Sequence, residues 1–142
     1  MAEDDRRAQS ASHYTRITPS LGLTSVLALA AQVTRCPIAL INVVDGTHQH
    51  TVAAHGFDTG IVVPLSTSAC AGVIRRGAPV TILDSASPDA AEDVADPLRR
   101  AGFRAYAGIP LLGREDLPVA TLCVLDTEPH TCLLYTSPSP RD

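Results

Sequence analysis

The stretch Ile38-Ala-Leu-Ile-Asn-Val-Val44 decides the fold, because it is apolar at both its odd and its even positions. A strand with one wet face alternates apolar and polar side chains, whereas a strand covered on both faces is apolar throughout. The pattern therefore predicts a central strand with cover on both sides of its sheet. The stretch Val119-Ala-Thr-Leu-Cys-Val-Leu-Asp126 has the same character. We expect these two strands to be neighbours at the centre of one sheet.

Weaker signals place further elements on either side of the first strand. Asp45-Gly46 is a hairpin signal that leads into a more polar strand over 48–55. Upstream, Thr18 as a helix cap, Pro19 at the first helical position and apolar residues at helical spacing predict a helix over 19–34. Downstream, the patterns predict a helix over 66–76 ended by Gly77, a strand over 80–83, helical turns over 88–101 interrupted by Pro97, and strands over 103–112 and 119–126.

This order of elements predicts the fold class. Hairpins pair strands antiparallel, the helices fall between strands at irregular intervals, and the sequence has no glycine-rich phosphate loop. We therefore expect an α+β fold, a three-layer sandwich with a central antiparallel sheet of five to six strands and helices on both sides.

The composition excludes several classes of protein. The chain has 142 residues, of which 45% are hydrophobic and 18% charged, which suits one folded domain. All 11 basic residues are arginines and are outnumbered by 15 acids, so no basic surface for nucleic acid is expected. The most apolar stretch, 21–33, is short and interrupted by polar residues, and the start MAEDDRR is acidic. We expect a cytoplasmic protein without a membrane span.

The two ends of the chain differ from its middle. Residues 1–17 are polar without an apolar repeat, and we expect a flexible lead there. Residues 132–142 end in Ser-Pro-Ser-Pro and resemble one reading frame of a transposase-type sequencing adapter, with a natural proline-rich linker as the alternative. On the adapter interpretation this tail is not native, its deletion should change nothing measurable, and residues 18–131 are a domain cut short at its C-terminal end.

Five segments together resemble a bacterial GAF domain. They are Cys36 to Asp45, Ser68-Ala-Cys70, Pro79 to Asp84, Phe103 to Leu111, and Ala120 to Asp126. The resemblance implies a ligand-sized pocket on one face of the sheet and signalling helices on the other, with the C-terminal helix of the family missing from this chain. It further implies a sensory or regulatory input module of a bacterial signalling protein. It also implies a homodimer in the full-length protein and a C-terminal output domain, such as a histidine kinase or a diguanylate cyclase, that receives the signal.

The resemblance and the strand patterns indicate candidate residues for binding an unknown small molecule. The Cys70 thiol lies where the family has its pocket, and Cys123 is expected in the core or at the pocket floor. Arg104 and Tyr106 share one face of a predicted strand, and Thr121 lies on the neighbouring strand. For Arg104 and Tyr106 the alternative is a solvated arginine and a core aromatic ring. The full candidate set is Cys70, Ile74, Arg104, Tyr106, Thr121 and Cys123.

The sequence gives weaker support to catalysis and to metal binding. The four cysteines include no C-x-x-C pair, and His48 and His50 share a strand face without a further ligand at suitable spacing, so we expect no metal and no cofactor. Cys70 is followed by Ala71 rather than the histidine of bilin-binding relatives, and the lysine of cyclic-nucleotide-binding relatives is absent. We expect no enzyme activity in this chain. The alternatives are a Cys-dependent redox enzyme that resembles free methionine sulfoxide reductase, with Cys70 as its nucleophile, and a ligand-free dimerisation module.

Overall fold

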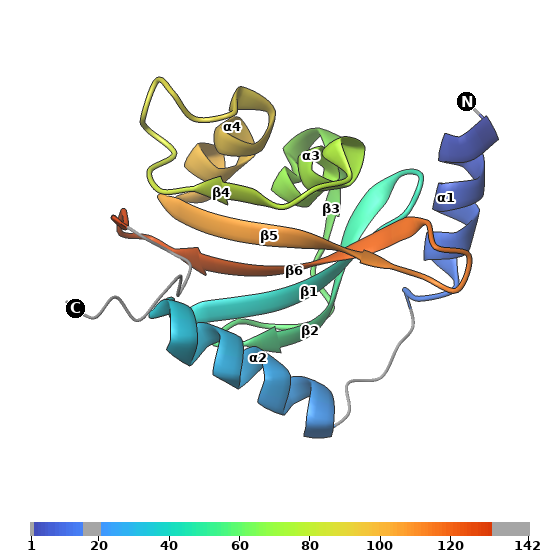
Figure 1. The fold of residues 1–142 in the computed structure, drawn as a ribbon, viewed down its shortest axis with the longest axis horizontal. Coiled ribbons are helices and arrows are strands. Elements are labelled where there is room, and N and C mark those ends of the chain that lie inside the picture. The colour runs from blue at the N-terminus through green and yellow to red at the C-terminus, as the bar shows by residue number, and fades with distance from the viewer. Residues whose placement is uncertain (1, 16–20, 132–142) are drawn as a thin grey trace.

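The computed structural model describes residues 2–15 and 21–131, which form one antiparallel sheet with helices on both of its faces (Figure 1). The order of the six strands in this described part is β3-β2-β1-β6-β5-β4. The elements are α1 (Ala2–Ser12), α2 (Leu21–Thr34), β1 (Ile38–Val44), β2 (His48–His55), β3 (Val62–Pro64), the 3₁₀ turn η1 (Leu65–Thr67), α3 (Ala69–Arg76), β4 (Val80–Ile82), α4 (Glu92–Ala101), β5 (Ala105–Leu112) and β6 (Pro118–Asp126).

The strands β1 and β6 lie side by side at the centre of the sheet. They pair antiparallel, with Leu40 opposite Cys123 and Asn42 opposite Thr121. Every residue of β1 is buried, and each of the two strands has a second neighbour on its outer side. The predicted adjacency and central position of these strands are confirmed, and so is the reason for them, since both faces of the sheet are covered.

Two separate cores form because successive residues of β1 point to opposite faces. Ala39, Ile41 and Val43 pack toward α2, in a core that contains Leu27 and Ala31. Leu40 and its neighbours of the same parity pack toward α3 and α4, in a core that contains Val73 and Leu98. Figure 1 shows α2 on one side of the sheet and the pair α3 and α4 on the other. The predicted three-layer α+β architecture is confirmed.

The edge strand β3 has no counterpart among the predicted strands. It has three residues and pairs with β2 only through them. A segment of this length is too short to show a period of two, and Pro64 is a residue that strand patterns exclude from sheet interiors.

The helices that flank the candidate site begin later than expected. The predicted helix over 66–76 is split into η1 and α3, because the Ser68 hydroxyl caps α3 by accepting the Ala71 N–H at 3.0 Å. Gly77 ends α3 in the left-handed region, as expected. The helix α4 begins at Glu92 and continues through Pro97, which was expected to interrupt it. Pro97 is buried, so tertiary packing supports the helix where one backbone hydrogen bond is lost.

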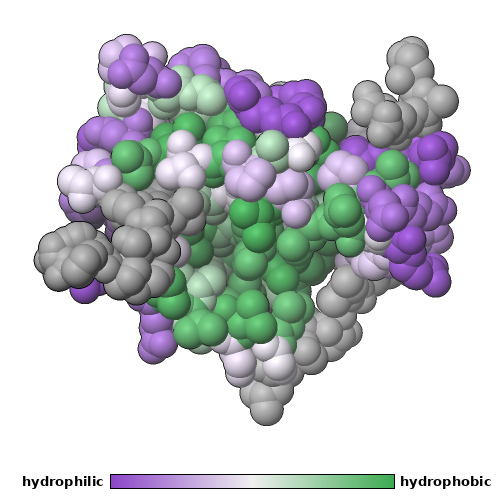
Figure 2. Space-filling view, in the orientation of Figure 1, coloured by the Kyte–Doolittle hydropathy of each residue, from purple (hydrophilic) through white to green (hydrophobic). Residues whose placement is uncertain are grey.

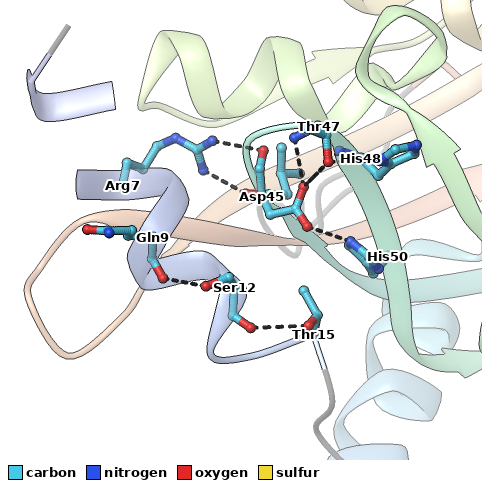
Figure 3. A network of polar contacts seen from close by, with 9 residues as sticks. Arg7, Gln9, Ser12, Thr15, Asp45, Thr47, His48 and His50 are labelled. Atoms are coloured by element: carbon cyan, nitrogen blue, oxygen red, sulfur yellow. Dashed lines mark hydrogen bonds and ion pairs between the residues drawn. The ribbon is translucent and has the colours of Figure 1, made fainter. Parts of the chain in front are cut away.

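The expectation of a flexible lead is wrong for residues 2–12, which form α1. Ala11 is fully buried against the sheet. The Arg7 guanidinium donates hydrogen bonds to the backbone oxygens of Val44 at 2.7 Å, Asp45 at 3.2 Å and Pro118 at 3.3 Å. Figure 3 shows Arg7 reaching from α1 to the turn at Asp45. The helix is therefore attached to the turn between β1 and β2 and to the start of β6.

Some expectations concern segments outside the described residues. These are the cap at Thr18, the first helical position at Pro19 and the adapter-like tail 132–142. Within residues 2–15 and 21–131, none of the helices has the length and apolar character that a membrane crossing requires.

Candidate functional site

A cavity of about 140 Å³ lies between the sheet and the helices α3 and α4. Its walls are largely apolar and include Leu40 from β1, Val63 from β3 and Leu98 from α4. The polar groups that line it are amides, hydroxyls and thiols, and the described residues around it include no Asp, Glu, His or Arg side chain. The cavity therefore suits a small, neutral and partly apolar molecule.

The Cys70 sulfur is the centre of a buried polar cluster in this cavity. The Thr121 hydroxyl donates to Cys70 Sγ at 2.9 Å, and the Asn42 side-chain amide donates to it at 3.3 Å. The Tyr106 hydroxyl lies 3.2 Å away, and Cys123 Sγ lies 4.0 Å away. Four polar groups from three adjacent strands thus surround one sulfur on the first turn of α3.

The orientation of Asn42 is set by its neighbour on β2. The Thr51 hydroxyl donates to the Asn42 side-chain oxygen at 2.6 Å. The side-chain nitrogen of Asn42 is consequently directed at the two sulfurs, 3.3 Å from Cys70 Sγ and 3.7 Å from Cys123 Sγ. Thr51 and Asn42 are opposite one another in the sheet, so register alone brings them together.

Tyr106 reaches Cys70 because the strand residue two positions further on has no side chain. The Tyr106 ring lies over Gly108, where an added Cβ would be 2.8 Å from Cζ of the ring. Tyr106 is only 1% exposed, so its hydroxyl is removed from water and depends on partners inside the protein. The glycine therefore positions the phenol against the sulfur.

Hydrogen bonding makes the two cysteines of the site unequal. The contact with the Cys123 thiol is the largest influence on Cys70, and with the hydrogen bonds of Thr121, Tyr106 and Asn42 it lowers the pKa of Cys70 to about 6 despite the opposing effect of burial. The same contact with Cys70, together with burial, raises the pKa of Cys123 well above its usual value. Burial raises the pKa of Tyr106 as well, so the phenol remains a neutral hydrogen-bonding group.

The structure brings together four of the six candidate residues and separates the other two. Cys70, Tyr106, Thr121 and Cys123 form the cluster just described. Ile74 lies one turn further along α3, in the same core, but it lines a separate, larger groove between α1 and α3. Arg104 does not line the cavity, because its guanidinium forms two bonds with the Asp84 carboxylate, at 2.7 and 2.9 Å.

Asn42 and Thr51 are not among the site residues predicted from the sequence. A signal for Asn42 was present, because it is the one polar side chain in the stretch 38–44. A buried polar residue in a central strand needs partners, which is a reason to look for a site beside it. Thr51 could be found only once the register of β1 and β2 was known.

The histidines and the third free cysteine lie away from the cavity. His50 bonds Asp45 at 2.7 Å and His48 bonds Thr47 at 2.8 Å, within the turn drawn in Figure 3. Among the described residues, no group of three or more His, Cys, Asp or Glu side chains is placed to hold a metal ion. Cys36 is buried in the core beside α2, and this burial raises its pKa.

Comparisons with known proteins agree with this architecture. The chain is 33% identical over 105 residues to a cyclic di-GMP phosphodiesterase of Pseudomonas aeruginosa, a match that covers 74% of this chain and 18% of that protein. The chain thus spans less than a fifth of the length of this relative.

Two solved structures share the fold. The GAF domain of an Acinetobacter phosphoenolpyruvate-protein phosphotransferase superimposes with a TM-score of 0.59 at 15% identity, covering 89% of this chain and 78% of that one. A free methionine-R-sulfoxide reductase from Neisseria meningitidis, solved with its substrate, also gives a TM-score of 0.59 at 15% identity, covering 89% and 74%.

The sequence itself matches the model of one family over most of its length. The match extends over residues 21–137 and the family is described as the GAF domain, a family of sensory and regulatory modules. It includes the whole sheet, α2, α3 and α4. This chain therefore belongs to the GAF domain family.

Proposed function

We propose that this chain is the sensory input module of a bacterial signalling protein and that its cavity binds a small, uncharged molecule. The observation that carries the proposal is the cavity of about 140 Å³, whose described lining residues include no Asp, Glu, His or Arg. An engineered apolar cavity of about 150 Å³ in another protein takes up benzene or xenon, so this cavity has room for a molecule of similar size.

The same observation sets limits on the ligand. A phosphate or carboxylate group would lose its hydration in this cavity without gaining an opposite charge there, which is strongly unfavourable. Hydrogen bonds from groups such as Asn42 and Tyr106 would orient a neutral ligand.

The signal would leave the module through its helices. Ligand binding shifts an equilibrium between two arrangements only by its difference in affinity for them, so the ligand must contact parts that move. In this proposal α3 and α4, which cover the cavity, are those parts. The receiving output domain, such as a histidine kinase or a diguanylate cyclase, belongs to the same signalling protein, and the relative named as a cyclic di-GMP phosphodiesterase supports a signalling enzyme.

The test is a binding experiment with neutral and charged probes of matched size. Toluene and benzoate are added to the ¹⁵N-labelled chain, and amide chemical shifts are followed by NMR. Toluene should shift resonances of residues around the cavity in a saturable way, whereas benzoate should not. Saturable binding of benzoate alone, or of neither probe, would contradict the proposal.

A matched pair of variants on β3 makes this test specific. Val63 lines the cavity, whereas its neighbour Val62 is 51% exposed and does not. Val63→Trp should fill the space and abolish toluene binding. Val62→Trp adds the same side chain on the outer face and should leave binding unchanged.

Self-association is a second candidate function, and one feature of α2 favours it. Val26, Leu29 and Val33 are 50%, 59% and 49% exposed. They follow one another at intervals of three and four residues, which is the spacing of a seam between paired helices. In this proposal α2 of one copy packs against α2 of a second copy in a homodimer.

A further inference from the structure

We propose that Cys70 and Cys123 form an oxidisable thiol pair that reacts with small uncharged peroxides entering the cavity. Cys70 is the attacking thiol, and Cys123 is the resolving thiol. The inference rests on the proposed function, because it needs a cavity that admits small neutral molecules, and it names the chemical class of one such molecule.

The geometry of the pair supports this assignment. Both residues are free thiols, 2% and 1% exposed, and their sulfurs are 4.0 Å apart. The sulfurs come from different layers, Cys70 from α3 and Cys123 from β6. Hydrogen peroxide is uncharged and is much smaller than the cavity of about 140 Å³.

The cavity connects these buried sulfurs with solvent. Its walls include both cysteines and the exposed residues Phe57, Thr67 and Ala101. Phe57 is 42% exposed and packs edge-on against Phe103, at 6.4 Å between ring centres. A small molecule can therefore reach Cys70 without unfolding of the domain.

The surroundings decide which cysteine attacks. The donors from Thr121 and Asn42 converge on Cys70 and stabilise its thiolate, which is the nucleophilic form. A thiol with a pKa near ambient pH is the most effective attacking group, and the pKa of Cys70 is about 6. Cys123 keeps its proton until the second step, in agreement with its raised pKa.

The chemistry balances in two steps. The Cys70 thiolate donates an electron pair to one peroxide oxygen, the O–O bond breaks, and the other oxygen leaves as hydroxide or alkoxide and takes up a proton. Cys70 is now a sulfenic acid. Cys123 then attacks the Cys70 sulfur, the S–S bond forms, and the S–O bond breaks with release of water. Two thiols and one peroxide thus give one disulfide, one water and one water or alcohol.

Disulfide formation would change the structure in a way that a sensor can use. The sulfurs must approach from 4.0 Å to the roughly 2.05 Å of an S–S bond. This movement draws the first turn of α3 toward β6. In the reducing cytoplasm that the sequence predicts for this protein, both thiols remain reduced until an oxidant arrives.

The experiment uses the full chain with Cys132→Ser, so that the thiol in the tail cannot compete. The reduced protein is treated with one equivalent of hydrogen peroxide, the remaining thiols are alkylated under denaturing conditions, and the peptides are mapped by mass spectrometry. We expect a disulfide between Cys70 and Cys123, with Cys36 still alkylated. A chain in which Cys36 oxidises first, or in which a tenfold excess of peroxide leaves the pair reduced, overturns the inference.

Three variants separate the roles of the two sulfurs. Cys123→Ser should stop the reaction at the sulfenic acid, which dimedone then traps on Cys70. Cys70→Ser should abolish oxidation of Cys123, whereas Cys36→Ser should behave as the parent chain does. Labelling of Cys123 by dimedone in the Cys70→Ser variant, at the rate seen for Cys70, would reverse the assignment and so contradict it.

A fourth variant keeps the proposal testable if a cysteine variant fails to fold. Thr121→Val preserves both thiols and the shape of the side chain but removes the donor at 2.9 Å. Disulfide formation should slow roughly fivefold, the effect of losing one hydrogen bond to the attacking sulfur. An unchanged rate would show that the donors do not activate Cys70.

The toluene titration distinguishes failure of this inference from failure of the proposed function. Saturable toluene binding with no oxidation of Cys70 contradicts the thiol chemistry and leaves the sensory cavity supported. Absence of both contradicts both.

Discussion

Gly108 is the residue on which the position of Tyr106 depends. A methyl group at this position would lie 2.8 Å from Tyr106 Cζ, on a strand whose neighbours cannot move easily. We expect Gly108→Ala to lower the free energy of unfolding by about 1–3 kcal/mol, the usual cost of overpacking. Urea unfolding monitored by circular dichroism measures it.

A double-mutant cycle identifies the cause. In a Tyr106→Leu background the ring is gone, and Gly108→Ala should cost less than it does in the parent chain. Equal costs in the two backgrounds would show that the strain lies elsewhere.

Asp45 makes part of the stability depend on pH. Burial opposes its ionisation, but the N–H groups of Thr47 and His48 and the ring of His50 outweigh it and lower the pKa of Asp45 to about 2. The unfolded value is about 3.9. A carboxylate with a lowered folded pKa stabilises the fold above the unfolded value and loses this contribution as pH falls toward the folded one.

The substitution Asp45→Asn tests this dependence. At pH 7 it should lower the free energy of unfolding by about 1–2 kcal/mol, and this difference from the parent chain should shrink between pH 4 and pH 2. Urea unfolding at several pH values gives the measurement. A difference that stays constant down to pH 2 would contradict the role given to this carboxylate.

At the scale of elements, α1 depends on the guanidinium of Arg7. Its three bonds to backbone oxygens connect the helix to the sheet. We expect Arg7→Ala to raise the rate of amide hydrogen exchange in residues 2–12 by about tenfold, with little change in β1. Arg6→Ala is the matched control, because Arg6 is exposed on the same helix, and it should leave exchange unchanged. Equal exchange in the two variants would show that α1 is held by other contacts.

The exposed apolar stripe of α2, formed by Val26, Leu29 and Val33, gives a prediction about self-association. Leu29→Glu places a charge in the middle of the stripe and should shift the chain toward monomer in sedimentation velocity at a fixed concentration. Gln32→Glu, on an exposed position of the same helix, introduces the same charge as a control. A parent chain that is monomeric at all concentrations would count against the dimer.

The elements differ in how far the sequence could predict them. β1 and β6 were predictable because a strand buried on both faces carries apolar side chains at both its odd and its even positions. α1 was not, since its attachment depends on one long side chain that reaches backbone oxygens 37, 38 and 111 residues away in sequence. β3 has three residues, which are too few to establish a period of two.

The candidate site was predictable in part. The position of a residue along its strand gives the face of the sheet on which it lies, and the family resemblance indicates the face with the pocket. Thr121 and Cys123 share the cavity side of β6, as expected. Val119 departs from this alternation, because the register slips between Leu111 and Leu112 of β5, and it packs in the core beside α2. Arg104 has the parity of Tyr106, yet Asp84, which no spacing rule connects with it, pairs with its charge at the strand entry.

At the scale of the whole molecule, the double cover of the sheet makes its centre sensitive to charge. Leu40 lies on β1 beneath the layer formed by α3 and α4, and it is only 4% exposed. Leu40→Asp should lower the free energy of unfolding by more than about 4 kcal/mol, because an unpaired carboxylate would be buried. Leu112→Asp is the control, since Leu112 is 60% exposed. Thermal unfolding by circular dichroism should show a cooperative transition for the control alone.

The molecule also leaves apolar surface uncovered. Figure 2 shows an apolar area at the centre of the view, over the strands and α2. Exposed residues of this kind include Ile109 on β5, at 42%, and the stripe of α2. The cavity and this surface are on opposite sides of the same sheet.

The alternation of β6 brings these two sides very close together. Cys123 belongs to the core beneath α3 and α4, and Val124, the next residue, belongs to the core beneath α2. At this point of β6, the core on the cavity side and the core on the α2 side are therefore one peptide bond apart. A twist of β6 about its own axis, caused by a change at one sulfur, would reach the opposite surface without any hinge, loop or domain movement.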